Sequence, residues 1–163
     1  MDSLALTFRP ATREDLPRLV ELLADDPLGG QRERVSTPLL EGYCSAFTAI
    51  DGDTNNELVV AVLEGKGLIG VLQLTFIPYL TYRGGWRALI EGVRVAADMR
   101  SSGVGGLMFL WAIERAKVRG CHMLQLTSDK SRPDAIRFYE GLGFTASHEG
   151  MKMQLSMGQD LNA

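Results

Sequence analysis

The chain has 163 residues, of which 45% are hydrophobic and 23% are charged. This composition is typical of a soluble globular protein and predicts a single domain over residues 1–163. The formal net charge of −3 argues against general nucleic-acid binding, which requires a basic face. No stretch is apolar for long enough to cross a bilayer and no signal-peptide pattern opens the chain, so we expect a cytoplasmic protein with no membrane partner.

Two cysteines, Cys44 and Cys121, lie far apart in the chain and near no clustered histidines. No metal-ligand spacing is present, so we expect two reduced thiols and no bound metal.

The first half of the chain predicts one strand, two helices and a hairpin. Leu4 to Arg9 alternates loosely, as a strand does, and Pro10 ends it. Thr12 then caps a helix whose apolar positions recur at helical spacing. A second helix is expected from about Pro38 to Ala49. Two β-rich runs around a glycine-containing turn predict a hairpin: Glu57–Leu63 and Leu68–Ile77.

The second half predicts alternating strands and helices after a loop over Pro78–Trp86. The expected elements are a strand over Arg87–Val95, a helix that ends near Arg119, a strand over Cys121–Thr127, and a helix from Pro133 to about Gly141. Met151–Met157 alternates as a half-buried strand does, which we prefer to a soft methionine-rich binding surface. The order β-α-α-β-β-β-α-β-α-β-β predicts an α/β fold with a central mixed sheet of about six to seven strands flanked by helices.

The segment from Arg100 to Gly105 has the spacing R-x-x-G-x-G between a predicted strand and a predicted helix. The first N–H groups of a helix lack internal partners and carry partial positive charge, so they can bind an anion. Gly103 and Gly105 have no Cβ, so the backbone can approach a phosphate closely. The spacing matches neither the Walker nor the Rossmann pattern. Taken alone, an ordinary glycine-rich helix start explains it equally well.

A second motif, Asp134-Ala-Ile-Arg-Phe-Tyr-Glu-Gly-Leu-Gly-Phe144, follows the next predicted strand. Together the two motifs resemble the GNAT N-acetyltransferase superfamily. Its phosphate loop reads Gln/Arg-x-x-Gly-x-Gly/Ala, and its next helix often reads Ala-x-x-Phe-Tyr-x-x-x-Gly-Phe. The resemblance is specific from about Glu91 to Phe144, whereas over the first half only the order of elements agrees. It implies a GNAT-type fold that uses acetyl-CoA as co-substrate.

In that family the acetyl-CoA pantetheine enters a gap between two splayed parallel strands and pairs with the backbone before the phosphate loop. The resemblance therefore implies a cofactor-binding set on the fourth strand and the loop: Val93, Val95, Arg100, Ser101, Ser102, Gly103, Val104, Gly105 and Gly106. Val93 and Val95 can also pack in the core, because only their backbone groups would bind. Arg132 stands where many relatives have Asn, which leaves the cofactor contacts at that end open.

The resemblance also implies two catalytic residues. Tyr139 matches the family's usual general acid, which protonates the CoA thiolate; the alternative is simple packing beside Phe138. Glu91 stands where Glu is common in the family and is the candidate general base; the alternative is a structural carboxylate. Strand alternation places Glu91, Val93 and Val95 on one face unless a bulge intervenes.

These residues predict an N-acetyltransferase that moves acetyl from acetyl-CoA to a primary amine of a small molecule or peptide. Direct attack is expected, because the cysteines offer no nucleophile–base motif. One alternative is a non-catalytic acyl-CoA-binding sensor or regulatory domain of the same fold. Another is an unrelated nucleotide-binding α/β domain, although the first half alternates less regularly than that fold requires.

The identity of the amine acceptor stays open at this stage. Three aromatic residues of the expected loop could frame an acceptor, pack within the loop or form a homodimer surface: Tyr79, Tyr82 and Trp86. Three acidic residues could attract an amine, although a solvated acidic turn explains them better: Asp25, Asp26 and Glu33.

Overall fold

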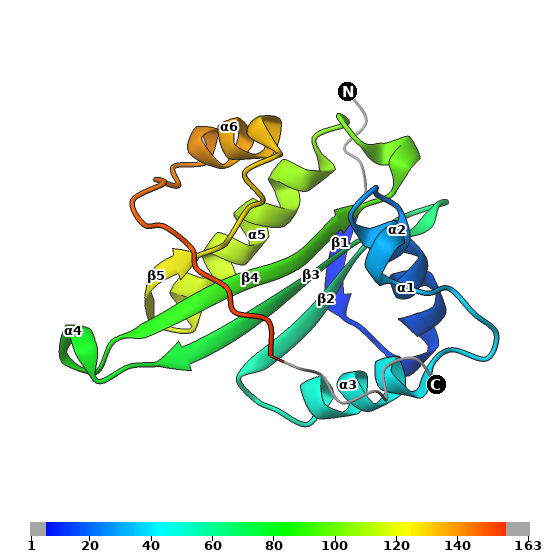
Figure 1. The fold of residues 1–163 in the computed structure, drawn as a ribbon, viewed down its shortest axis with the longest axis horizontal. Helices are drawn as coiled ribbons and strands as arrows, with labels where there is room; N and C mark the ends of the chain where they lie inside the picture. The colour runs from blue at the N-terminus through cyan, green and yellow to red at the C-terminus, as the bar shows by residue number, and fades with distance from the viewer. Residues whose placement is uncertain (1–5, 156–163) are drawn as a thin grey trace.

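The computed structural model describes residues 6–155 and contains one mixed sheet (Figure 1). Five strands in the described residues follow the order β1-β2-β3-β4-β5. The first four pair antiparallel, whereas β5 runs parallel to β4. The strands are β1 (Leu6–Pro10), β2 (Asn56–Leu63), β3 (Gly67–Pro78), β4 (Trp86–Val95) and β5 (Cys121–Gln125). The predicted α/β fold with a mixed central sheet is confirmed.

Helices cover both faces of this sheet and connect its strands (Figure 1). A short 3₁₀ turn, η1 (Arg13–Asp15), precedes the first helix, and another, η2 (Ala97–Met99), follows β4. The α-helices are α1 (Leu16–Ala24), α2 (Gly29–Arg32), α3 (Glu41–Asp51), α4 (Thr81–Gly84), α5 (Val104–Val118) and α6 (Pro133–Gly141).

The two faces of the sheet are distinguished by what packs on Gly70 and Gly92. Met108 of α5 lies so close to Gly70 that a Cβ on this glycine would stand 2.8 Å from the Met108 sulfur. On the other face, Leu23 of α1 lies 4.0 Å from the position of a Gly92 Cβ. We call these the α5 face and the α1 face. Because β-strand side chains alternate between faces, strand pairing assigns the remaining residues to one face or the other.

The core extends over both faces of the sheet, and on one of them it lies between the sheet and α5. Leu74 and Met108 have no exposed surface, and Phe76 and Leu72 are each 1% exposed. At the edge of this layer, the guanidinium of Arg115 on α5 donates to the Glu57 carboxylate of β2, with Nε 2.8 Å from Oε2. This ion pair fixes α5 across the sheet, and α5 in turn carries the loop that precedes it.

Most predicted elements are present, with shifted ends. Thr12 is the N-terminal cap of η1, which leads directly into α1, and the Asp15 carboxylate accepts from the Thr12 backbone N–H at 2.7 Å, as in a capping box. The first strand runs from Leu6 to Pro10 in the structure, and its predicted start at Leu4 lies outside the described residues. The second predicted helix begins at Glu41 rather than Pro38. The predicted loop over residues 78–86 contains the short helix α4.

The strand predicted over Met151–Met157 is wrong for its described part. Residues 142–155 contain no strand, and the side chains of Met151, Met153 and Leu155 are 94%, 84% and 75% exposed. Met157 lies outside the described residues. An alternating pattern shows which side chains would share a face, but a strand also needs a neighbour that accepts its hydrogen bonds. The segment instead crosses in front of the sheet (Figure 1) and has no strand partner among the described residues, so fewer strands form than predicted.

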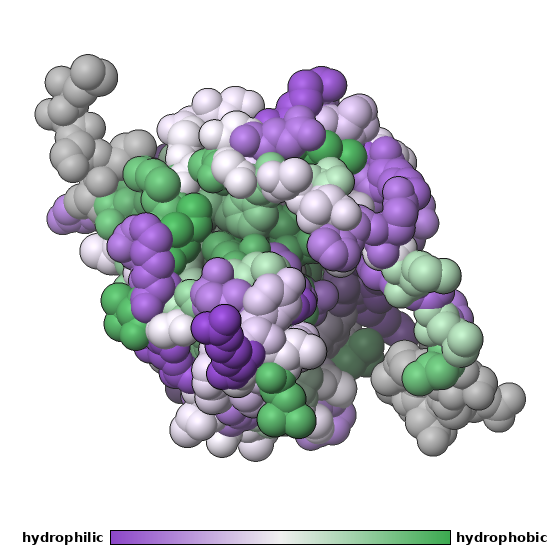
Figure 2. Space-filling model, turned by 90° about the vertical axis from the view of Figure 1, so that its left-hand side faces the viewer, coloured by the Kyte–Doolittle hydropathy of each residue, from purple (hydrophilic) through white to green (hydrophobic). Residues whose placement is uncertain are grey.

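As a result, the outer edge of β5 stays uncovered by any strand in the part of the chain that the structure describes. Figure 2 views this side and shows apolar residues gathered in a hollow there. The exposed large apolar side chains contributed by α5, β5 and α6 are Leu107, Leu110, Val118, Met123 and Phe138.

The buried position of Leu74 at the centre of β3 leads to a stability prediction. Leu74→Ala removes fully buried methyl groups and should lower the free energy of unfolding by about 2–5 kcal/mol. Leu80→Ala is the matched control, since Leu80 is 99% exposed and its loss should change stability by less than about 0.5 kcal/mol. Urea denaturation of both variants measures this. Equal stability of the two variants would contradict the assigned core.

Candidate active site

The central feature of the candidate site is that β4 and β5 stay paired over only part of their length. Pairing begins at Trp86 and Cys121 and ends at Leu89 and Gln125. Beyond this point β4 continues to Val95, whereas the chain after β5 leaves the sheet toward α6. Residues 90–95 therefore present a backbone edge with no strand partner among the described residues. Since backbone N–H and C=O groups require hydrogen-bond partners, this edge can pair with the amides of a ligand.

Beyond Leu89, β4 and the chain after β5 are separated by a gap. A β-bulge in β4 determines which side chains lie on each face of the sheet beside this gap. Val71 pairs with Arg94 and Gln73 pairs with Glu91, so β4 holds one extra residue between these pairs. Gly92 takes up the irregularity with a φ of +62°, in the left-handed region that favours glycine.

The bulge places Glu91 and the two valines on opposite faces. Glu91 and Arg94 share the α1 face, because their partners Gln73 and Val71 are two residues apart in β3. Val95 pairs with Gly70 on the α5 face, and its side chain lies 4.0 Å from the position of a Gly105 Cβ. Val93 alternates with Arg94 and therefore also faces α5. Strict alternation would place Glu91 on the same face as Val93 and Val95, but the bulge intervenes and this placement does not hold.

The predicted phosphate loop lies at the end of the open edge. The chain passes through η2, then through Ser101 and Gly103, which have φ values of +61° and +88°. Gly103 is the N-terminal cap of α5, and Ser102 Oγ donates to the Met99 carbonyl at 2.5 Å. A Cβ on Gly105 would meet only ordinary contacts, and one on Gly106 would meet nothing within 4 Å. The first backbone N–H groups of α5 have no partner within the helix, so they can bind an anion.

Two arginine–aspartate pairs attach this loop to the end of α1. The Arg100 guanidinium donates to the Asp25 carbonyl at 2.5 Å and pairs with the Asp25 carboxylate at 3.0 Å. The Arg94 guanidinium lies 2.9 Å from the Asp26 carboxylate, and both side chains are only 15% exposed. Arg100 therefore contacts α1 here, and a phosphate contact from it stays a prediction.

Asp26 is stabilised in its charged form. Its partial burial raises the pKa of the carboxyl, but the Gly29 backbone N–H and the charges of Arg94 and Arg132 lower it further, so that the pKa lies below its usual value. The positive charge of Arg132, just before α6, thus favours the charged form of Asp26. Arg132 also lowers the pKa of Asp129, whose main partner is Ser131. The position where relatives carry Asn thus adds positive charge beside the gap.

Tyr139 lies on the α5 side within an aromatic cluster. Its ring centre is 5.4 Å from that of Phe109, 5.5 Å from Phe138 and 6.1 Å from Phe144. The Phe144 backbone N–H also donates to the Tyr139 carbonyl at 3.0 Å. These contacts explain the Phe-Tyr and Gly-Phe spacing of the motif, and they hold Tyr139 on the opposite side of the sheet from Glu91.

The other residues considered for acceptor binding have partners within the protein. Besides the paired aspartates, Glu33 accepts a hydrogen bond from the Tyr43 hydroxyl at 2.9 Å. The Arg87 guanidinium stacks between Tyr79 and Tyr82, at 4.7 and 5.1 Å from their ring centres. These aromatic residues therefore stabilise the β3–β4 tip.

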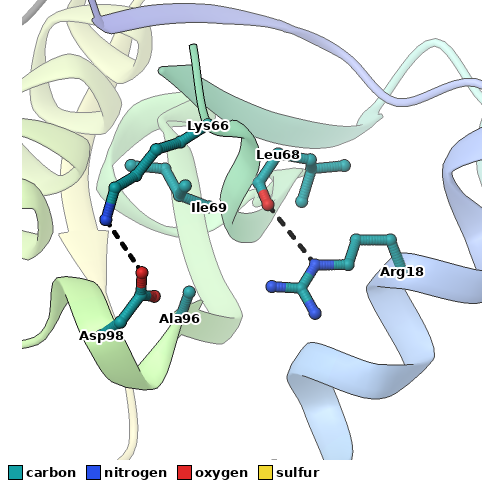
Figure 3. Close-up of a pocket in the computed structure, with 6 residues that line it drawn as sticks. All are labelled: Arg18, Lys66, Leu68, Ile69, Ala96 and Asp98. Atoms are coloured by element: carbon teal, nitrogen blue, oxygen red, sulfur yellow. Dashed lines mark hydrogen bonds and ion pairs between the residues drawn. The ribbon is translucent and has the colours of Figure 1, made fainter. Parts of the chain in front are cut away.

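A pocket near η2 is lined by residues of α1, the β2–β3 turn, β3 and the segment after β4 (Figure 3). Arg18 donates to the Leu68 carbonyl at 3.5 Å, and Lys66 pairs with Asp98 at 2.9 Å across the same pocket. Its charged side chains already have partners, and it contains none of the predicted site residues.

Sequence reasoning missed a polar group on the α1 face next to Glu91: Asn56 on β2 with Gln73 and Thr75 on β3. The sequence does contain a signal for this group, because two polar residues stand at positions 73 and 75 within the apolar run of β3. In residues 6–155 we find no group of three His, Cys, Asp or Glu side chains arranged to hold a metal ion. Nor does any helix in this part of the chain have the length and apolar character needed to span a membrane.

Two curated N-acetyltransferases are similar in sequence to this chain. An aminoalkylphosphonate N-acetyltransferase from Salmonella typhimurium is 27% identical over 108 residues, which cover 66% of this chain and 69% of that protein. A glucosamine 6-phosphate N-acetyltransferase from Trypanosoma brucei brucei is 33% identical over 89 residues, which cover 54% of this chain and 58% of that protein. The chain thus matches less than two thirds of the second relative.

A crystal structure described as a transcriptional regulator from Bacillus halodurans C-125 is 57% identical, with a TM-score of 0.88 over 92% of this chain and 99% of that one. The sequence model of the acetyltransferase (GNAT) family matches residues 16–144. That match rules out an unrelated nucleotide-binding domain. The chain belongs to the acetyltransferase (GNAT) family.

Proposed function

We propose that this protein transfers the acetyl group of acetyl-CoA to a primary amine by direct attack. The observation that carries the proposal is the unpaired edge of β4 beyond Leu89, with Tyr139 on the α5 side and Glu91 on the α1 side. An acid and a base on opposite faces of the sheet, beside one gap, suit a reaction in which the acetyl donor enters from one side and the amine acceptor from the other.

The residues of the gap and the loop fit acetyl-CoA. The backbone of Val93 and Val95 would pair with the pantetheine amides, because this edge has no strand partner among the described residues. The N–H groups from Ser101 to Gly106 would bind the diphosphate at the start of α5. Arg100 would act through its contact with Asp25, which holds the loop in place. When bound, acetyl-CoA supplies the activated acetyl group.

In the proposed reaction each catalytic residue moves one proton. Glu91 accepts a proton from the amine, directly or through water, so that the nitrogen lone pair can attack the acetyl carbon. The C–N bond forms as the C–S bond breaks, and Tyr139 donates its hydroxyl proton to the departing CoA sulfur. The nitrogen then releases its surplus proton to water, which leaves a neutral amide, and Tyr139 regains a proton from water. A covalent enzyme intermediate is disfavoured, because partial burial raises the pKa of the Cys121 thiol, whereas a nucleophilic cysteine requires a lowered one.

The acceptor we propose is a small-molecule primary amine. The two curated relatives are described as acetyltransferases for an aminoalkylphosphonate and for glucosamine 6-phosphate, both of which combine an amine with a phosphorus-containing anion. Amines of this kind are therefore the first to test, followed by polyamines, amino acids and peptides.

A second candidate is a non-catalytic acyl-CoA-binding regulatory domain of the same fold. The observation in its favour is that the 57% identical structure is described as a transcriptional regulator. Such a domain would bind acetyl-CoA without needing Glu91 or Tyr139. Measurable turnover with any amine, lost on changing these two residues, separates the enzyme from the regulator.

The loop assignment leads to a binding prediction. Gly105→Glu should weaken CoA binding by at least tenfold, about 1.4 kcal/mol, because it adds bulk and negative charge where the diphosphate would lie. Gly105→Ala is the control: the family's loop pattern has Gly or Ala at this position, and the added Cβ would meet only ordinary contacts at 3.9 and 4.0 Å, so binding should fall far less than with Glu. Isothermal titration calorimetry measures both. An unchanged affinity in a folded Gly105→Glu variant would remove the loop from the CoA site.

The general-acid role of Tyr139 leads to a kinetic prediction. Tyr139→Phe should lower kcat on the order of a hundredfold and leave acetyl-CoA affinity nearly intact, because the ring and its packing remain. The exposed Tyr82 provides a control, and Tyr82→Phe should keep wild-type kcat. Steady-state rates are compared where chemistry limits turnover. Wild-type kcat in Tyr139→Phe would show that the hydroxyl is dispensable.

The general-base role of Glu91 leads to a pH prediction. Glu91→Gln should lower kcat/KM most at low pH and remove or displace the acidic limb of the profile, since that limb reports the base and the amine together. Glu64→Gln at the exposed β2–β3 turn should leave the profile unchanged. Superimposable profiles for wild type and Glu91→Gln, with reduced thermal stability, would make Glu91 a structural carboxylate.

A further inference from the structure

Two polar side chains interrupt the apolar pattern of β3 on the α1 face. Gln73 and Thr75 are both half-buried, between the fully buried Leu72, Leu74 and Phe76 of the other face. Gln73 is the cross-strand partner of Glu91, and directly opposed side chains in such pairs share a face with their Cβ atoms about 4.5–5.5 Å apart. Gln73 and the candidate base Glu91 are therefore neighbours on one face of the sheet.

A chain of hydrogen bonds that starts at Asp53 fixes the orientation of this amide. Asn56 Nδ2 donates to the Asp53 carboxylate at 2.6 Å, which can only accept. Asn56 must then turn its Oδ1 toward β3, where it accepts from Gln73 Nε2 at 3.0 Å and from Thr75 Oγ at 2.9 Å. Because Gln73 donates through its nitrogen, its Oε1 is left as an acceptor.

Gln73 Oε1 and the Glu91 carboxylate both accept hydrogen bonds and both need a donor. Neither receives a hydrogen bond or an ion pair from any residue in the described part of the chain. Both groups accept hydrogen bonds, and their residues are cross-strand partners on the α1 face, the side of Glu91 in the proposed reaction. A protonated primary amine brings three N–H donors and a positive charge, and so complements both groups at once.

We propose that Gln73 binds and orients the acceptor amine, with its Oε1 accepting one N–H bond while Glu91 takes the proton. After this transfer the neutral amine still has two N–H groups, and the one held by Gln73 sets the direction of the nitrogen lone pair. The network from Asp53 through Asn56 keeps the acceptor oxygen of Gln73 available. The inference rests on the proposed function and adds the amine-binding residue of that same site.

The test uses Gln73→Met, which keeps the length of the side chain and removes the acceptor oxygen. With the best substrate among an aminoalkylphosphonate, glucosamine 6-phosphate and a polyamine panel, the KM for the amine should rise at least about tenfold, the effect of losing one hydrogen bond to a charged group. Acetyl-CoA affinity and the acidic limb of the pH profile should stay as in wild type, because Glu91 is intact. Thr75→Val is the matched control: it removes the other bond to Asn56 and should leave the amine KM unchanged.

Gln73→Glu provides a second readout if Gln73→Met folds poorly. It places a second carboxylate beside Glu91, and like charges raise the pKa of the pair, so the acidic limb should move to higher pH. A wild-type amine KM in Gln73→Met, or an unmoved limb in Gln73→Glu, overturns the proposal while leaving acetyl transfer intact. A wild-type protein that acetylates none of these amines contradicts the proposed function itself, which is a different result.

Discussion

The backbone hydrogen bonds that β4 leaves unmade on its β5 side are the feature on which the site depends. A strand inside a sheet normally satisfies both edges, but β4 loses its neighbour after Leu89 while its other edge stays paired with β3 as far as Val95. This leaves a rigid strand with one open edge in the middle of the molecule. The loop at its end leads into α5, whose first N–H groups have no partner within the helix. Backbone groups that could bind amides and N–H groups that could bind a diphosphate therefore follow one another along the chain.

The side chains around this edge are held by contacts that cross the fold. Asp25 and Asp26 join the end of α1 to Arg100 and Arg94, and the aromatic cluster around Phe109 holds α6 on α5. The bulge at Gly92 then separates the two candidate catalytic groups, with Glu91 on the α1 face and Tyr139 on the α5 side. Separation by the sheet would let each group exchange a proton with a different reactant, so that neither neutralises the other.

Local patterns in the sequence predicted much of this arrangement, and long-range pairing determined the rest. The glycines of the loop and the Phe-Tyr motif together resemble the acetyltransferase family, and that resemblance indicated the candidate site. The bulge was not predictable, since it appears only when β4 is aligned with β3. The contact of Arg100 with Asp25 joins residues distant in the chain. The alternating Met151, Met153 and Leu155 misled for the same reason, because their pattern contains no information on whether a partner edge exists.

Hydrogen–deuterium exchange with and without acetyl-CoA tests the central claim most directly, because it reads the backbone N–H groups themselves. The account predicts slower exchange in two segments on adding acetyl-CoA, residues 93–95 of β4 and residues 101–106 of the loop, with little change in β1. Slower exchange confined to the pocket near η2, or unchanged exchange in β4 at saturating acetyl-CoA, would contradict the assignment of the open edge as the donor site.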